Sequence, residues 1–532
     1  MNTEHTYISY RETNSFSKVV VDYVNEEKQL MEFIQDFPSI EAIKKQLERK
    51  QFNAKSREIL CNVLNEYYKN IEASNETKTN IDLLPHESTF TICTAHQPSL
   101  LTGHLYFIYK IIHAIKLAME CKSLFPAYNF VPIFYMGSED NDLDEIGAFH
   151  YHDKNYHWHT SQTGACGRMR TTEMEQMIQE VRTTLNEAND DEATLSSILV
   201  QAYNGENTLA QATSVLVNAL FDKYGLVIVD ADDKCLKQLF SEVMKEELLQ
   251  QSSQALVQET LDAINKHYKI QANPREINLF YLKGNLRERI EKNGDTWHVV
   301  NTEIKFSREE IIEELHNHPD RFSPNVILRP LYQETILPNI AFVGGGGELA
   351  YWLELKKLFQ HHNITYPILF LRNSVLWLNE KTAALIDKMN LSNQQLFLKK
   401  DLLFKELLQQ HDVMQKVEAQ VTLIQQNFDE LKKLSAHVSS SLERSMHAHN
   451  AKAKRIEDRI KQKYIAALKQ KETLLFQRIE SIQHMVSPNA TLQERHNNFL
   501  SIFKVHGFRM LDILLQHQEA FGKEFLILKD KQ

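Results

Sequence analysis

Residues 89–118 read TFTICTAHQPSLLTGHLYFIYKIIHAIKLA and contain the strongest local signal in the chain. The β-branched beginning predicts a strand that ends at Ala95, and the amphipathic second half predicts a helix that begins near Leu101 or Thr102. A parallel strand followed by a helix directs the free N–H groups of the first helical turn toward the carboxyl edge of the sheet. Phosphate groups are the usual ligands at such a position.

The polar break within this stretch lies between two histidines, His96 and His104. We expect His96 to be catalytic by stabilising charge that develops on a phosphate chain, and Gln97, Gly103 and His104 to contact a bound cofactor. The alternative is that each histidine is an ordinary loop residue with no role in binding.

Other short apolar runs of β character follow this stretch and alternate with helical patterns, which is typical of a doubly wound parallel sheet. The runs are TFTICTA, FVPIFYMG, GLVIVDAD, NIAFVGG and PILFL. We therefore predict an α/β fold with a Rossmann-type parallel-sheet core at residues 86–380. Two stretches near 148–220 and 235–325 interrupt the alternation and are predicted to be insertions, the second with strands at INLFYLKG and WHVV.

The segments outside the core are predicted to be helical. Residues 1–85 form a helical lead-in with Ser39 as an N-cap, and residues 488–532 form helices that return to the core. Residues 381–487 contain no glycine or proline, and their apolar residues follow heptads. The heptad positions are Leu403, Leu407, Met414, Val417, Val421, Ile424, Phe428, Leu431, Val438 and Leu442, and then Ile456, Ile460, Tyr464, Leu468, Leu475, Ile479 and Ile482.

These heptads predict a long antiparallel coiled-coil hairpin. An apolar stripe along such an arm normally packs against a partner, so we expect a homodimer through this coiled coil. The alternative is a pair of amphipathic helices folded back onto their own core.

Composition limits the class of protein. The chain has 532 residues with 42% hydrophobic and 24% charged residues, and it contains no apolar run long enough to cross a bilayer. The net charge of -10 argues against nucleic acid as a partner. The five cysteines lack CxxC spacing, and the N-terminus lacks a signal-peptide pattern, so we expect a cytoplasmic enzyme with no membrane partner.

An acidic block, SEDNDLDEI, follows the run FVPIFYMG at the carboxyl end of a predicted strand. We expect Glu139, Asp140 and Asp142 to be catalytic, because such a cluster can hold Mg²⁺, bind an ammonium group or act as a general base. The alternative is an acidic loop whose carboxylates cap the next helix, and this explains Asp144 and Glu145.

A third block, residues 323–359, combines a probable helix, a strand and a cluster of glycines. Clustered glycines in a chain with only 15 of them suggest that backbone approaches a ligand, and the alternative is a structural turn. The predicted cofactor-binding residues are Gly344, Gly345, Gly346 and Gly347. The predicted substrate-binding residues are Arg329, Gln333, Glu348, Tyr351, Trp352 and, beyond this block, Arg372.

The stretch HYHDKNYHWHT places His150, His152, His157 and His159 close together in the sequence. It has no neighbouring cysteines and no HxxxH spacing, so we predict no metal site there, although pairs of histidines two residues apart share one face of a strand.

Taken together, the blocks TAHQPSLLTGHLYFIYK, PIFYMGSEDNDLDEI, SPNVILRPLYQETILPNIAFVGGGGELAYW and LQERHNNF resemble the BshC family, the cysteine-adding enzymes of bacillithiol biosynthesis. The resemblance covers nearly the whole chain. It implies a core related to class I aminoacyl-tRNA synthetases and a ligase that joins the carboxyl group of L-cysteine to the amine of glucosaminyl-malate. The family usually carries proline at position 104, which favours His96 over His104 as the catalytic residue, and a KMSKS-like loop is absent.

Amide formation from a free carboxylate needs a leaving group, so ATP or another nucleotide is expected, with Mg²⁺ as a possible companion. The malate carboxylates suit guanidinium groups, and Arg329 and Arg372 are the candidates. Two alternatives stay open: a synthetase-like aminoacyl transferase with a different amine acceptor, and a noncatalytic coiled-coil scaffold.

Overall fold

A parallel sheet of five strands forms the centre of the computed structural model, which describes residues 2–185 and 188–531. All five predicted runs are strands of this sheet, and every neighbouring pair is parallel, so the Rossmann-type core is confirmed. Nearly every side chain of these strands is buried, as expected for a sheet covered by helices on both faces. The order is β13 (Ile368–Leu371), β12 (Asn339–Gly344), β2 (Thr89–His96), β3 (Asn129–Met136) and β6 (Val227–Asp230).

Helix α5 (Leu105–Leu124) packs against β2 and β3, but it begins later than the sequence predicts. A short 3-10 helix at Leu100–Thr102 precedes it. Leu101, Thr102 and Gly103 all have positive φ, at 46°, 65° and 62°. Three consecutive left-handed residues cannot continue into an α-helix, so the chain turns once more before α5 starts.

The N-terminal segment contains the predicted helices. Ser39 caps α2 as predicted, because its side chain accepts the N–H of Ala42. The helices are α1 (Lys18–Val24), α2 (Ile40–Arg49), α3 (Ala54–Tyr67) and α4 (Asn75–Leu83).

Both ends of the described chain also form strands that the sequence did not predict. Strand β15 (Glu524–Lys531) lies between β1 (Asn2–Ser9), which is antiparallel to it, and β14 (Val375–Leu378), which is parallel. The expectation of purely helical end segments is therefore wrong. Residues 525–528 are a short apolar run, and such a run does not distinguish a strand from a buried turn of helix. Helices α23 (Leu500–His506) and α24 (Arg509–His517) precede β15.

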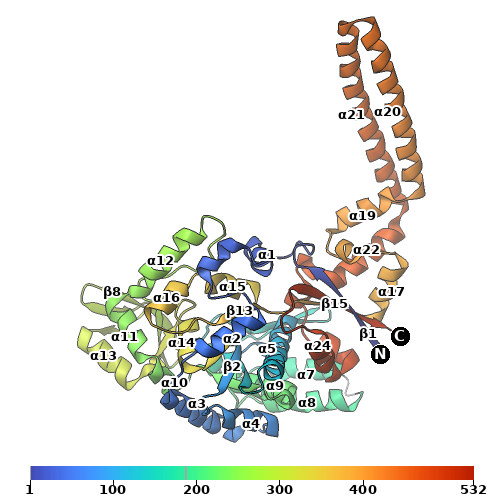
Figure 1. Ribbon diagram of the computed structural model, residues 1–532. Coiled ribbons are helices and arrows are strands. Elements are labelled where there is room, and N and C mark those ends of the chain that lie inside the picture. The colour runs from blue at the N-terminus through green and yellow to red at the C-terminus, as the bar shows by residue number, and fades with distance from the viewer. Residues whose placement is uncertain (1, 186–187, 532) are drawn as a thin grey trace.

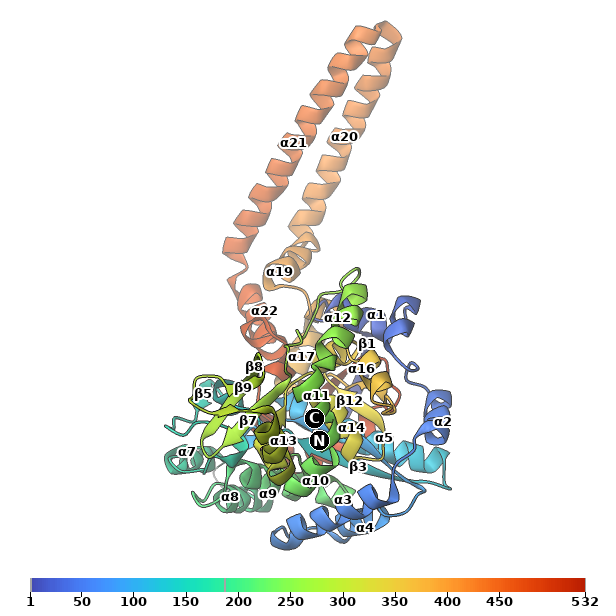
Figure 2. The ribbon, with the colours of Figure 1, turned by 90° about the vertical axis from the view of Figure 1, so that its left-hand side faces the viewer.

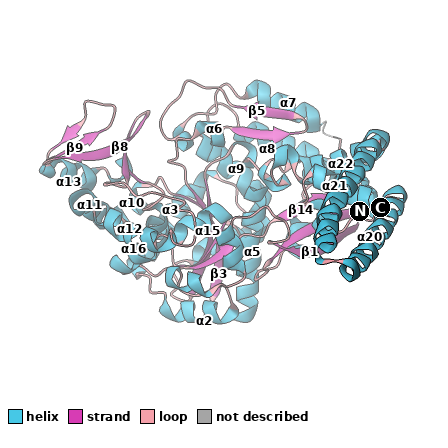
Figure 3. Ribbon diagram, turned by 90° about the horizontal axis from the view of Figure 1, so that it is seen from above, coloured by secondary structure: helices cyan, strands magenta, loops and turns pink. Residues whose placement is uncertain are grey.

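The two interruptions of the core fold into two separate groups of helices and strands (Figures 2 and 3). The first contains a two-stranded antiparallel sheet and three helices: β4 (Ala148–Tyr151), β5 (Lys154–His157), α7 (Glu175–Leu185), α8 (Asp190–Ala202) and α9 (Leu209–Phe221). The second contains four helices: α10 (Lys234–Leu239), α11 (Ser241–Gln250), α12 (Ser252–Ile264) and α13 (Arg308–Asn317).

The second interruption also forms an antiparallel sheet with the order β10-β9-β8-β7-β11. Its strands are β7 (Leu279–Lys283), β8 (Leu286–Asn293), β9 (Thr296–Val299), β10 (Lys305–Phe306) and β11 (Phe322–Pro324). The strands expected at INLFYLKG and WHVV are thus confirmed as β7 and β9. The chain then returns to the core through α14 (Arg329–Ile336), α15 (Gly346–Trp352) and α16 (Lys356–His361).

The glycine-free segment forms a long helical hairpin that projects away from the core (Figure 1). Helix α20 (Asp412–Val438) ends where Ser439 caps α21 (Ser440–Lys471), so Leu442 belongs to the second helix. Because the hairpin projects outward, the alternative in which these helices fold onto their own core is wrong. Shorter helices form its base: α17 (Glu380–Lys388), α18 (Asn393–Leu396), α19 (Lys400–Gln409) and α22 (Thr473–Val486). Within the described residues, no helix is both long and apolar enough to cross a bilayer.

Candidate active site

A cleft of about 830 Å³ opens at the carboxyl edge of the central sheet. A residue at or just after the end of every strand of this sheet lines it: His96, Gly137, Ala231, Gly345 and Arg372. The carboxyl edge is where ligands bind in open α/β folds. The predicted site residues that line the cleft are His96, Gln97, Glu139, Asp140, Asp142, Arg329, Gly345, Gly346, Gly347, Glu348, Tyr351 and Arg372.

His96 ends β2 with its imidazole held in one orientation. Its Nδ1 lies 3.1 Å from the carbonyl oxygen of Gln97, which can only accept, so we assign the proton to Nδ1. Burial and the nearby Lys110 ammonium lower the pKa of His96 to about 3. The ring is therefore neutral and its Nε2 carries a lone pair, which argues against the predicted contact with a phosphate chain. His96 can instead accept a hydrogen bond.

A segment near the C-terminus, at Asn497 and Asn498, forms hydrogen bonds with the residues at the start of α5. The Leu105 N–H donates to the Asn497 carbonyl (2.8 Å), and the Asn498 side chain donates to the carbonyls of Leu101 (2.8 Å) and Gly103 (2.6 Å). The Asn497 carbonyl thus occupies the Leu105 N–H at the start of α5, where the sequence predicts a phosphate.

His104 also faces this segment, because its Nδ1 lies 3.2 Å from the His496 carbonyl. Neither Gly103 nor His104 is among the residues that line the cleft. These two predicted cofactor-binding residues therefore lie outside the cleft lining, although the rings of His96 and His104 both pack on Tyr106, with centroids 5.6 and 5.7 Å from it.

The glycine cluster begins α15 and divides into two pairs. A Cβ at Gly344 would lie 2.7 Å from the Phe342 ring, and one at Gly346 would lie 2.8 Å from Val20, so packing requires glycine at both positions. A Cβ at Gly347 would meet no atom within 4 Å, and Gly345 has only ordinary contacts. The Gly345 N–H already donates to Glu348 (2.8 Å) and its carbonyl accepts the Leu349 N–H (2.8 Å), so Gly347 is the position where backbone is open to a ligand in the cleft.

Two cationic side chains that line the cleft form hydrogen bonds with residues of α15. Lys110, a buried residue of α5 that the sequence did not indicate, donates to Glu348 (2.6 Å) and to the Ala95 carbonyl (2.6 Å). Burial lowers the pKa of Lys110. Arg329 donates to the Tyr351 hydroxyl. Both cations lie at the cleft, each held by hydrogen bonds to protein groups.

Gln333 and Trp352 do not line the cleft, although substrate contacts were predicted for both. Gln333 is buried and bonds to Arg329 (3.3 Å) and Glu334 (2.9 Å). Trp352 is fully buried and stacks on Phe342 with ring centroids 4.5 Å apart. Each lies four residues after a cleft-lining residue, Arg329 or Glu348, but its side chain is buried in the core, so the structure does not place either of them at the cleft as predicted.

The acidic block forms one wall of the cleft. Asp140 accepts a hydrogen bond from Gln97 (3.3 Å), and this contact joins the first two sequence blocks. Glu139 is buried and paired with Lys237, and burial raises the pKa of its carboxyl although Lys237 opposes the rise. Asp142 caps α6 (Leu143–Ile146) through the Glu145 N–H (3.2 Å). The cap predicted for Asp144 or Glu145 is thus formed by Asp142.

Arginines of the second insertion form a basic wall of the cleft. Arg275, Arg287 and Arg289 line the cleft, and none of them was predicted. Arg287 donates to Asn141 (2.9 Å), so the basic wall touches the acidic wall directly. Arg287 and Arg289 lie two residues apart on β8 and therefore share one face, a signal that is readable in the run LRERIEKN once a strand is assigned there.

Arg372, a predicted substrate ligand, is held by Glu494 through a bidentate ion pair. Its two terminal nitrogens lie 2.9 and 2.7 Å from the carboxylate oxygens, and both side chains are almost fully buried, at 3% and 0% exposure. Glu494 also accepts the Val375 N–H (3.1 Å). Glu494 therefore occupies the two guanidinium nitrogens of Arg372 that were predicted to bind the malate carboxylates.

The histidines of the first insertion do not converge on one point. His150 bonds to Asn155 (2.7 Å), and its ring lies 4.0 Å from that of His496, whereas the rings of His157 and His159 are 6.3 Å apart. Among the described residues, the one group of three or more potential metal ligands lies elsewhere, at Glu246, His361 and His362.

Two family models match nearly the whole chain. The model described as "Bacillithiol biosynthesis BshC, N-terminal Rossmann-like domain" matches residues 1–373, and that of the "C-terminal coiled-coil domain" matches residues 375–529. The chain belongs to the BshC family. The ion pair of Arg372 and Glu494 thus joins the two BshC domains.

Relatives agree with this membership. BshC proteins from Flavobacterium johnsoniae and Flavobacterium psychrophilum, both named "Putative cysteine ligase BshC", are 41% and 40% identical, each over 98% of this chain and 99% of the relative. A crystal structure titled "putative arginyl t-RNA synthetase" from Campylobacter jejuni is 9% identical, covers 87% of this chain and 99% of its own, and has a TM-score of 0.23. A TM-score this low does not show a structural relationship with synthetases.

Proposed function

We propose that this BshC chain is a ligase that joins the carboxyl group of L-cysteine to the amine of glucosaminyl-malate and so forms bacillithiol. The observation that supports this proposal best is the direct contact of the two walls at Arg287 and Asn141. An acceptor with an amine at one end and two carboxylates at the other needs acidic and basic groups side by side. The cleft provides both within one volume.

In this proposal the acceptor amine lies near Asp140 and His96. Asp140 binds the ammonium form and takes its proton, and the neutral His96 accepts a hydrogen bond from the amine through Nε2. The malate carboxylates lie against Arg287, Arg289 and Arg275, which take over the role that the sequence assigned to Arg372. Arg329 remains a candidate for the carboxylate of L-cysteine.

A nucleotide would supply the leaving group that a free carboxylate lacks. The open backbone at Gly347 and the cleft volume of about 830 Å³ fit such a ligand. We therefore propose that the glycine loop, rather than the start of α5, contacts it. The amine, which has already given one proton to Asp140, then forms a bond from its nitrogen to the carbonyl carbon. The leaving group departs with its electron pair and takes up the second amine proton.

The test is reconstitution with L-cysteine, glucosaminyl-malate and a panel of nucleotides with Mg²⁺, followed by mass spectrometry of thiols. Bacillithiol that appears only with a nucleotide supports the whole proposal. Product without any nucleotide would refute the assignment of the glycine loop but not the ligase. Turnover of L-cysteine with other amines in preference to glucosaminyl-malate would favour the transferase alternative, and binding without turnover would favour a scaffold.

We expect His96→Ala to lower kcat about tenfold or more with little change in KM, because the lost acceptor acts on the reacting amine. His104→Ala serves as the control and should have a smaller effect, since His104 does not line the cleft. With its pKa near 3, His96 stays neutral at assay pH, so the kcat profile should lack a limb from its titration. An acidic limb near pH 6.5 that vanishes in His96→Ala would contradict the neutral form.

We infer that the hairpin forms a homodimer. Apolar side chains remain exposed along it, including Leu434 at 62%, Val438 at 73% and Ile456 at 56%. Replacing residues 412–471 with a short linker is expected to leave a folded core that sediments as a monomer. A short linker can close the gap because the side chains of His411 and Glu472, which flank the removed segment, lie 3.7 Å apart at the base of the hairpin. A truncated protein that still sediments as a dimer would show that the interface lies elsewhere.

A further inference from the structure

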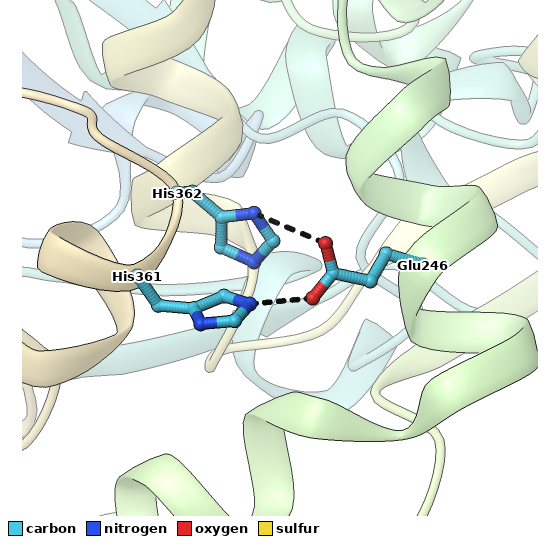
Figure 4. Close-up of side chains that lie close together, drawn as sticks. All are labelled: Glu246, His361 and His362. Carbon is cyan, nitrogen blue, oxygen red and sulfur yellow. Dashed lines mark hydrogen bonds and ion pairs between the residues drawn. The ribbon is translucent and has the colours of Figure 1, made fainter.

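Three potential metal ligands meet between the second insertion and the core (Figure 4). Glu246 lies on α11 of the insertion, His361 is the last residue of α16, and His362 follows it directly. The site is separate from the cleft, because none of the three residues lines it. Neither the proposed reaction nor the predicted site residues account for this group.

The donor atoms converge on a small volume. His361 Nε2 lies 2.6 Å from one oxygen of Glu246, and His362 Nδ1 lies 3.9 Å from the other. One ligand atom from each residue falls within 4.8 Å of the other two. A tetrahedral Zn²⁺ with bonds of about 2.0–2.2 Å holds its ligand atoms roughly 3.4 Å apart, so side-chain rotation suffices to close the site.

A neighbouring hydroxyl also contacts the cluster. The His362 side chain is 9% exposed, and Glu246 accepts a hydrogen bond from Ser252 (2.7 Å). Ser252 therefore orients the carboxylate from outside the cluster, as second partners of metal ligands do.

A simple ion pair between Glu246 and His361 would explain one imidazole. The second imidazole lies 3.9 Å from the other oxygen of Glu246, too far for a hydrogen bond, and its ring centroid lies 4.8 Å from the first at 90° to it. Two imidazole nitrogens and a carboxylate are a donor set that divalent zinc prefers, and the open fourth position would hold water.

We propose that Glu246, His361 and His362 bind one Zn²⁺ ion that ties the second insertion to the core. The next residue of α11, Glu247, connects the proposed site to the sheet that lines the cleft. Glu247 accepts both the backbone N–H (2.8 Å) and the side-chain amide (2.9 Å) of Asn278, which directly precedes β7. Fixing α11 therefore fixes the start of the sheet that carries Arg287 into the cleft.

The test uses the full-length chain dialysed against a chelator and then titrated with Zn²⁺ by calorimetry. We expect one ion per chain, a dissociation constant on the order of micromolar, and a Tm raised by a few degrees at saturating Zn²⁺. X-ray absorption should report nitrogen and oxygen ligands and no sulfur. This outcome is independent of whether the ligase proposal holds, because it needs no substrate.

Single variants locate the site. His361→Ala and His362→Ala should each weaken Zn²⁺ binding at least tenfold without changing the Tm of the metal-free chain by more than a degree or so. The matched control is His267→Ala, an exposed histidine outside the cluster. Cys235→Ser tests the exposed thiol, because a cysteine thiolate can also bind Zn²⁺. A signal that disappears in Cys235→Ser, persists in both cluster variants, or is absent from the wild type would overturn the proposal.

Discussion

Replacing Glu494 with alanine is expected to lower the free energy of unfolding by about 3–5 kcal/mol, because it leaves the Arg372 guanidinium buried without a counter-charge. Glu494 is fully buried and accepts two hydrogen bonds from Arg372 and one from the Val375 backbone. The change therefore removes three contacts at the junction of the two BshC domains. Urea unfolding followed by circular dichroism measures the loss.

The matched control is an exposed pair of the same type. Lys400 and Glu480 lie 3.0 Å apart at the base of the hairpin, with 39% and 58% of their side chains exposed. Glu480→Ala should cost less than about 1 kcal/mol, since exposed ion pairs contribute little. The double variant Arg372→Met/Glu494→Leu should recover most of the loss. Equal effects of Glu494→Ala and Glu480→Ala would refute the importance of the buried pair.

The second large effect is expected at Asp140. Asp140→Asn should lower kcat/KM for the joining reaction about a hundredfold or more, because the amide cannot take the proton of the amine. The fold should survive: one carboxylate oxygen accepts the N–H groups of Asn141 (2.7 Å) and Asp142 (3.3 Å), and an amide oxygen can do the same. The measurement is initial rates over a range of glucosaminyl-malate concentrations, with the Tm determined in parallel.

Asp144→Asn is the control, because Asp144 is an exposed carboxylate of the same block that does not line the cleft. Its activity should stay within about twofold of the wild type. If Asp140→Asn were as active as Asp144→Asn, the acidic wall would have only a structural role. A fall in Tm that matched the fall in rate would lead to the same conclusion.

The strands of the core were predictable because each is an apolar run bounded by polar or glycine residues. The site was predictable in part, since the carboxyl ends of those strands meet at one edge of the sheet. His96, Asp140 and Gly345 lie at the cleft for this reason. The start of α5 was not predictable, because the left-handed turn at Leu101 and Thr102 depends on contacts with Asn498, nearly 400 residues away.

Long-range pairing explains the other misses. The bidentate partner of Arg372 is 122 residues further along the chain, and no local pattern connects the two. Arg287 and Arg289 reach the cleft only because the second insertion folds back over it. Trp352 and Gln333 lie on the same helical faces as residues that line the cleft. Sequence spacing alone could not show that the two side chains point into the core, because the helices are short.

The position of β15 between β1 and β14 constrains the order of events during synthesis on the ribosome. In the described chain β1 pairs with β15 alone, so the backbone groups of β1 lack their strand partner until residues 524–531 have been made. An unpaired strand is a site for misassembly with other nascent chains. Its sequence, NTEHTYIS, is mostly polar and carries a glutamate and a histidine, which makes it a poor template for such contacts. The composition of β1 thus protects the nascent protein through the long interval before its sheet can close.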